Sequence, residues 1–128
     1  MTMNYSDLPE LADVYLEDSY VLNISEEPNK IVFTMEFVLT ENHDSYSAPR
    51  EGEQYCYRDG YLTFTDVSKV EWLTQTLRKF TDAANEEDMG NVDFLTGENG
   101  SWHVGGDWGE ARIHTRRQPE ITFTAESA

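Results

Sequence analysis

One short segment, 105–110, has the residue types of a small-molecule site and reads Gly-Gly-Asp-Trp-Gly-Glu. Two adjacent glycines allow a backbone to approach a ligand closely, and Asp107 and Glu110 would supply polar contacts. Trp102 and Trp108 could form an aromatic wall for a sugar or a base. The simpler interpretation, which we favour, is a β-bulge or tight corner in which Trp108 covers the edge of the core. The candidate ligand-binding residues are Trp102, Trp108, Asp107, Glu110, Tyr55 and Tyr57.

A second grouping consists of histidines and carboxylates. His103 and His114 fall on neighbouring predicted strands. Together with Asp107 or Glu110 they would suit an enzyme with a carboxylate and histidine site. Zinc needs three or four converging ligands, and nothing in this spacing imposes convergence. The sequence also lacks a phosphate loop and a G-x-S-x-G nucleophile motif. We therefore expect surface or half-buried histidines, with no catalytic residue, no metal site and no cofactor.

The chain carries a net charge of −16, from 25 acidic and 9 basic residues. Nucleic acids and anionic membranes are not expected as partners, because binding them requires Lys and Arg to displace counterions. Solubility, adaptation to high salt, and an acidic face for a basic partner all stay open as explanations. We favour the third and predict a non-enzymatic binding protein with a basic protein partner. The alternatives are a carbohydrate-like small-ligand binder and an enzyme with a carboxylate and histidine site.

The elements that must position these residues are mostly strands. The clearest is 30–40, where apolar and polar residues alternate with the period of a strand. The alternation in 14–24 predicts a second strand, joined to the first by turn residues 25–29. The residues expected to face the core from the clearest strand are Ile31, Phe33, Met35, Phe37 and Leu39.

Turn residues divide the rest of the chain. Asp59-Gly60, between 55–58 and 61–64, predicts a hairpin with a two-residue type I′ turn. Segment 97–100 predicts another hairpin, and 108–115 and 121–124 complete the predicted strands. Residues 69–84 combine apolar residues at helical spacing with strand-like alternation, so helix and strand plus loop stay equally open. The predicted fold is mainly β: an antiparallel β-sandwich or open barrel of about seven or eight short strands, with at most one short helix at about 69–84.

At 128 residues the chain has the length of a single domain, 1–128, with 1–12 as a lead-in and 125–128 as a tail. Cys56 is the only cysteine, so it forms no intramolecular disulfide, and we expect a buried thiol. A signal peptide and a membrane-spanning apolar run are both missing, which favours the cytoplasm. We expect a monomer or a weak homodimer.

Four motifs resemble a family of small single-domain bacterial proteins of unknown function. They are Y-L-E-D-S-Y-V-L at 15–22, G-E-Q-Y-C-Y-R at 52–58, G-N-V-D at 90–93 and G-G-D-W-G-E at 105–110. The resemblance covers about residues 13–124. It implies a bacterial, cytoplasmic setting and carries over no catalytic residue. In size and style the chain is also similar to immunity proteins of bacterial toxin systems, which implies an inhibitor-like role.

Overall fold

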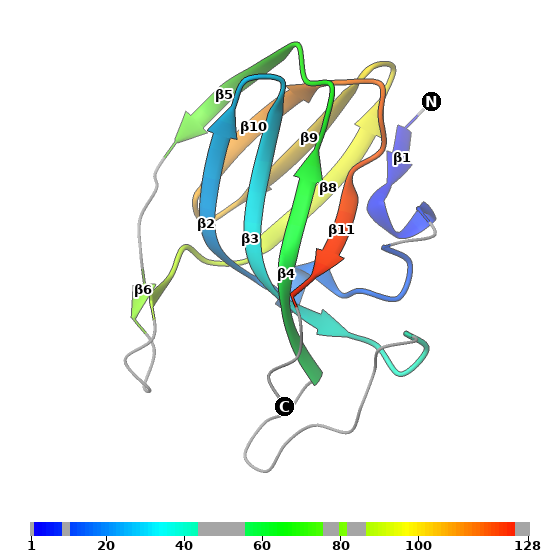
Figure 1. The fold of residues 1–128 in the computed structure, drawn as a ribbon, viewed down its shortest axis with the longest axis vertical. Coiled ribbons are helices and arrows are strands. Elements are labelled where there is room, and N and C mark those ends of the chain that lie inside the picture. The colour runs from blue at the N-terminus through cyan, green and yellow to red at the C-terminus, as the bar shows by residue number, and fades with distance from the viewer. Residues whose placement is uncertain (1, 9–10, 44–55, 76–79, 82–86, 125–128) are drawn as a thin grey trace.

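Apolar and polar residues alternate along most of the chain and produce two antiparallel sheets that share one core, as the computed structural model shows (Figure 1). The structure describes residues 2–8, 11–43, 56–75, 80–81 and 87–124. The five-stranded sheet has the order β1 (Thr2–Asn4), β8 (Val92–Glu98), β9 (Ser101–Gly106), β10 (Gly109–His114) and β5 (Lys69–Gln75). The four-stranded sheet has the order β11 (Glu120–Phe123), β4 (Cys56–Phe64), β3 (Lys30–Leu39) and β2 (Tyr20–Glu27).

The remaining elements are short. β6 (Phe80–Thr81) and β7 (Glu87–Asp88) form a separate antiparallel pair, and two three-residue 3-10 turns, η1 (Tyr5–Asp7) and η2 (Leu16–Asp18), precede β2. Within the described ranges, no helix has the length and apolar character needed to cross a membrane.

The predicted mainly β, antiparallel fold is confirmed, with nine strands in the two sheets rather than seven or eight. One added strand, β1, lies in the segment expected to be a lead-in. That segment also supplies three buried side chains to the core, those of Tyr5, Leu8 and Leu11. The start of the chain is therefore part of the packed structure. The predicted tail, 125–128, lies outside the described residues.

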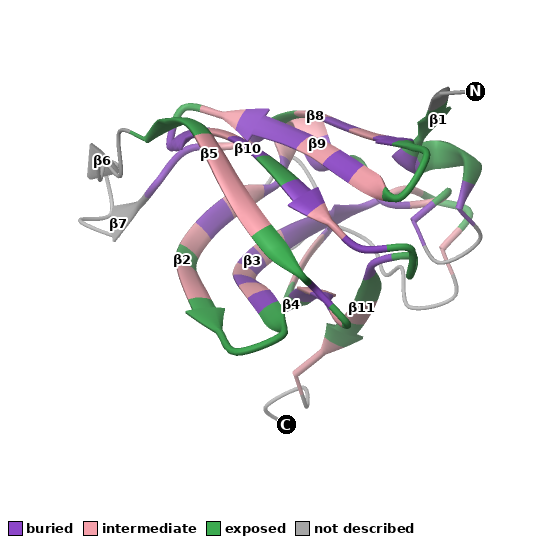
Figure 2. Cartoon of the chain, turned by 90° about the horizontal axis from the view of Figure 1, so that it is seen from above, coloured by how far each residue is buried: buried purple, intermediate pink, exposed green. Residues whose placement is uncertain are grey.

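β3 supplies the centre of the core, as its alternation predicts. Ile31, Phe33, Met35 and Phe37 have no exposed surface, and Leu39 keeps only 3%. Buried residues recur at alternate positions along most of β3 in Figure 2. The five-stranded sheet covers this row with Leu95, Val104 and Ile113, all fully buried. Burial of this kind is the main favourable contribution to the folding of such a sandwich.

Trp108 joins the two sheets at the core. Its ring is fully buried and meets Phe33 edge-on at 5.3 Å and Trp72 edge-on at 6.0 Å between ring centroids. Its indole N–H finds no hydrogen-bond acceptor in the described part of the chain. Packing rather than hydrogen bonding therefore holds this residue.

The hairpin predicted at Asp59-Gly60 is wrong, because β4 runs through both residues without turning. Gly60 pairs with Met35 of β3 on one side and with Phe123 of β11 on the other. A Cβ at Gly60 would lie 2.4 Å from the backbone oxygen of Thr122. The glycine is needed here because three strands approach closely, not because the chain reverses.

The open question at 69–84 is answered in part. Residues 69–75 form β5, which pairs with β10, so of the two open alternatives the strand is confirmed for them and the helix is excluded. Trp72 explains the outcome, because the strand turns this side chain toward the core and the Trp108 ring. Of the rest, only the two residues of β6 are described, and 76–79 and 82–84 lie outside the described residues.

The strand predicted for 14–24 begins later than expected, at Tyr20. The buried hydroxyl of Ser19 donates to the Tyr15 backbone oxygen at 2.8 Å and accepts from the Val38 backbone N–H at 2.9 Å. These bonds stabilise the 3-10 turn Leu16–Asp18 against the end of β3. The hairpins predicted around 25–29 and 97–100 are both confirmed, with Asn29, Asn99 and Gly100 at positive φ.

Tyr5 makes the stability of this fold sensitive to alkaline pH. Its buried hydroxyl donates to Glu17 Oε2 at 2.7 Å. Burial is the larger cause and this hydrogen bond the second of a Tyr5 pKa that is raised well above 10. The folded state therefore keeps a proton that the unfolded chain releases near pH 10, so the contribution is complete below pH 10 and is lost above it. We expect Tyr5→Phe to lower the free energy of unfolding by about 2 kcal/mol at pH 7.

The measurement is urea unfolding of both proteins between pH 7 and pH 11. The difference between wild type and Tyr5→Phe should shrink as the pH rises above about 10. A difference that stays constant across this range would contradict the assigned role of the Tyr5 proton.

Candidate protein-binding face

The residues predicted as a ligand site are dispersed in the structure. Trp108 is fully buried and Trp102 only 6% exposed, so the two rings form no open aromatic wall. Asp107 is exposed in the turn between β9 and β10, whereas Glu110 lies on the outer surface of β10. Tyr57 belongs to the other sheet. Tyr55 lies outside the described residues.

The two glycines at 105–106 are accounted for by the protein's own packing. A Cβ on Gly106 would lie 2.0 Å from the backbone oxygen of Asn91, and one on Gly105 would lie 2.5 Å from the Phe94 ring. β8 is irregular between Val92 and Phe94, opposite these glycines. Of the two simpler alternatives, the tight corner is present as the turn at Asp107-Trp108, and register shifts occur in the facing strand β8 between Val92 and Phe94 and in β10 between Glu110 and Ala111.

The outer surface of the five-stranded sheet carries two histidine–glutamate pairs. His103 Nε2 lies 2.5 Å from Glu110 Oε2, and His114 Nε2 lies 3.1 Å from Glu71 Oε1. The bond from His114, with Lys69 nearby, lowers the pKa of Glu71. Across the residues that the structure describes, no three His, Cys, Asp or Glu side chains converge as metal ligands. The structure thus brings His103 and Glu110 together as a hydrogen-bonded pair on the surface.

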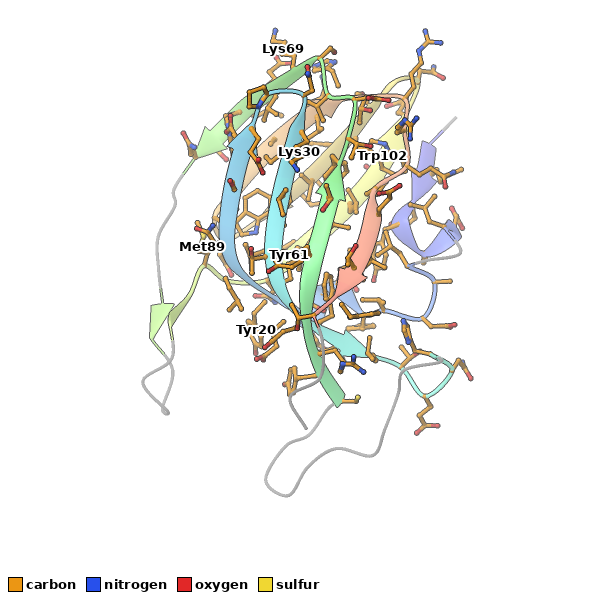
Figure 3. The ribbon with its side chains drawn as sticks, viewed as in Figure 1. Tyr20, Lys30, Tyr61, Lys69, Met89 and Trp102 are labelled. Atoms are coloured by element: carbon orange, nitrogen blue, oxygen red, sulfur yellow. The ribbon has the colours of Figure 1, made fainter. Side chains whose placement is uncertain are left out.

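The outer surface of the four-stranded sheet has a different character. Its strands alternate, so the residues between the core positions of β2, β3, β4 and β11 all point outward. We call this surface the acidic tyrosine face and define it by Tyr20, Glu36, Asp59, Tyr61, Glu120 and Thr122. Figure 3 labels Tyr20 and Tyr61 on this sheet, with Lys30 toward its other end.

The register brings like charges together on this face. Glu36 of β3 lies directly opposite Asp59 of β4 and, on its other side, directly opposite Tyr20 of β2. Tyr61 is the next outward residue along β4, and 39% of its surface is exposed. The register therefore places two carboxylates and two tyrosines next to one another on one outer surface.

Basic residues lie mainly elsewhere in the described structure. Lys30, at the turn between β2 and β3, pairs with Glu27 at 3.9 Å. The Arg58 guanidinium lies over the Phe123 ring, 5.4 Å from its centroid. The other basic residues of the described ranges belong to β5, β10 and the segment after β10: Lys69, Arg112, Arg116 and Arg117. Apart from Lys30 and Arg58, the described basic residues therefore lie away from the four-stranded sheet.

Sequence reasoning missed this face for an identifiable reason. The predicted hairpin at Asp59-Gly60 would have put Asp59 in a turn and Tyr61 on a separate strand. The alternation of 30–40 did place Glu36 on the polar side, but only the register with β4 reveals its acidic neighbour.

Comparison of the chain with protein-family models, curated proteins and solved structures gave no match in any of the three. No ligand, partner or activity is therefore transferred from a relative.

Proposed function

We propose that this protein is a cytoplasmic, non-enzymatic binding protein that uses the acidic tyrosine face to bind a basic protein partner, in the manner of an immunity or inhibitor protein. The observation that carries the proposal is the direct opposition of Glu36 and Asp59 beside Tyr20 and Tyr61. Two neighbouring carboxylates beside two tyrosines on one outer sheet surface would attract and orient a cationic partner.

The residue types of this face suit a protein interface. Tyrosine offers a large, rigid surface at low cost in conformational entropy and is enriched among residues that dominate binding energy. Carboxylates accept charge-assisted hydrogen bonds from Arg and Lys, and tyrosine rings attract the same cations. One flat face thus combines the groups that a basic partner needs.

The net charge adds a longer-range effect. A field from −16 charges attracts a basic protein and speeds the encounter, and salt screens this attraction over about 10 Å at 0.1 M. Binding should therefore weaken as salt rises. General solubility or salt adaptation would also explain the net charge. Under either explanation, however, removing charges from one outer surface should have the same effect as removing them from the other.

The test is capture of partners by the tagged full-length protein from a lysate of its own source cell, at low and moderate salt. We expect one basic protein to be retained in near-equal amount at low salt. The double variant Glu36→Gln, Asp59→Asn should then reduce its affinity at least about tenfold, and Tyr61→Ala about thirtyfold.

The matched control is Asp93→Asn with Glu98→Gln, two exposed residues of β8 in the other sheet. It removes the same two charges and should change the affinity less than about twofold. Equal losses in both double variants would mean that net charge alone binds the partner. An empty capture at both salt concentrations would refute the proposal.

A further inference from the structure

A pocket of about 220 Å³ opens at the end of the sandwich that holds the β8–β9 turn. It lies between β1, that turn and the segment that leads from β10 to β11. Its lining includes Met3, Gly97, Gly100, Trp102, Arg116 and Gln118. The pocket shares no residue with the acidic tyrosine face, so what it binds is independent of the proposed partner.

The floor of the pocket is apolar and firmly held. Gly97 pairs with Met3 on one side and with Trp102 on the other. A Cβ on Gly97 would lie 2.6 Å from the Trp102 ring, so the indole packs directly against the glycine backbone. The indole N–H donates to the Arg117 backbone oxygen at 3.0 Å. Trp102 is only 6% exposed and its donor is already used, so the small edge of the ring that reaches the pocket offers a ligand apolar contact alone.

The rim supplies a positive charge in a strongly acidic chain. Arg116 is exposed and forms no ion pair with any residue that the structure describes, whereas its neighbour Arg117 pairs with Asp66 at 2.5 Å. The Arg116 side chain passes over the β8–β9 turn, where its Cγ would lie 3.8 Å from a Cβ on Gly100. Gln118 lines the same pocket and adds a neutral amide. Glu98 is also a lining residue and would repel any ligand carboxylate that is not paired with Arg116.

We propose that this pocket binds a small aromatic monocarboxylate, with the ring against Met3 and Trp102 and the carboxylate paired with Arg116. Guanidinium binds carboxylate through two parallel hydrogen bonds, which orients the ligand as well as attracting it. A cavity of about 150 Å³ is enough to bind benzene, so this pocket has room for one ring with a small substituent.

The test is titration of the full-length protein with sodium benzoate, followed by amide and indole N–H shifts in a nitrogen–proton NMR spectrum. We expect saturable shifts at Gly97, Gly100 and the Trp102 indole, with a dissociation constant of about 1 mM. Benzamide, which has the same ring without the charge, and acetate, which has the charge without the ring, should each bind at least about tenfold more weakly.

Arg116→Gln should weaken benzoate binding at least about tenfold. The matched control is Arg117→Gln, which removes the same charge one residue away and should change binding less than about twofold. The proposal is overturned if benzoate gives no saturable shift up to about 10 mM, or if both arginine variants weaken binding equally. Equal binding of acetate would also overturn it, because the ring would then contribute nothing.

Discussion

Replacing Trp108 with alanine should lower the free energy of unfolding by about 3–5 kcal/mol, the largest loss we expect from a single truncation in this protein. The ring is fully buried, and it is the residue through which Phe33 of one sheet and Trp72 of the other meet. Removing it loses the apolar burial and leaves a cavity between two sheets that are held apart by their other side chains. Urea unfolding monitored by far-ultraviolet circular dichroism measures the loss as a lower midpoint.

Tyr15→Ala is the control for this experiment. Tyr15 is also a large aromatic residue, but 46% of its surface is exposed. We expect its removal to change the free energy of unfolding by less than about 0.5 kcal/mol. A loss below about 1.5 kcal/mol for Trp108→Ala would show that the ring does not join the sheets in the way described.

Gly106→Ala should be almost as damaging, with an expected loss of about 3 kcal/mol. The added methyl group would lie 2.0 Å from the Asn91 backbone oxygen and 2.7 Å from Trp108 Nε1. Neither obstacle is the free end of a flexible side chain, so β8 and β9 must separate at this point. The same urea unfolding experiment measures the effect. The tryptophan fluorescence spectrum should also change, because the buried ring of Trp108 is displaced.

Gly105→Ala is the matched control, one residue earlier in the same strand. Its added methyl group meets the ring of Phe94, a half-buried side chain on the outer surface that can move aside. We expect a loss of less than about 1 kcal/mol. Equal losses at the two positions would mean that these glycines act through backbone flexibility rather than through a close approach to Asn91.

The local sequence pattern was sufficient to predict structure where contacts with distant segments do not decide the conformation. The period-two alternation of 30–40 identifies the buried face of β3, because a strand has only two faces and one must be covered. The turns at Pro28-Asn29 and Asn99-Gly100 also follow from local chemistry, since Asn29, Asn99 and Gly100 accept positive φ at little cost. Asp59-Gly60 has the same local chemistry and yet lies within a strand.

The difference at Asp59-Gly60 comes from contacts made far along the chain. Gly60 is opposed by Met35 on one side and by Phe123 on the other, and the close approach of β11 leaves no room for a side chain. Likewise, β5 is a strand because Trp72 reaches the Trp108 ring, which is supplied by a later hairpin. Propensity is a weak guide where packing between distant segments decides.

By itself, the sequence determined the mainly β fold, the buried row of β3, two hairpin turns and the net charge of −16. Each of these depends on composition or on residues a few positions apart. Only the tertiary structure decided that Trp102 and Trp108 are covered and that Glu36 faces Asp59 beside two tyrosines. The physical reason is register. Which outward side chains become neighbours depends on how strands from different parts of the chain align, and that alignment is set by packing of the core on the opposite face.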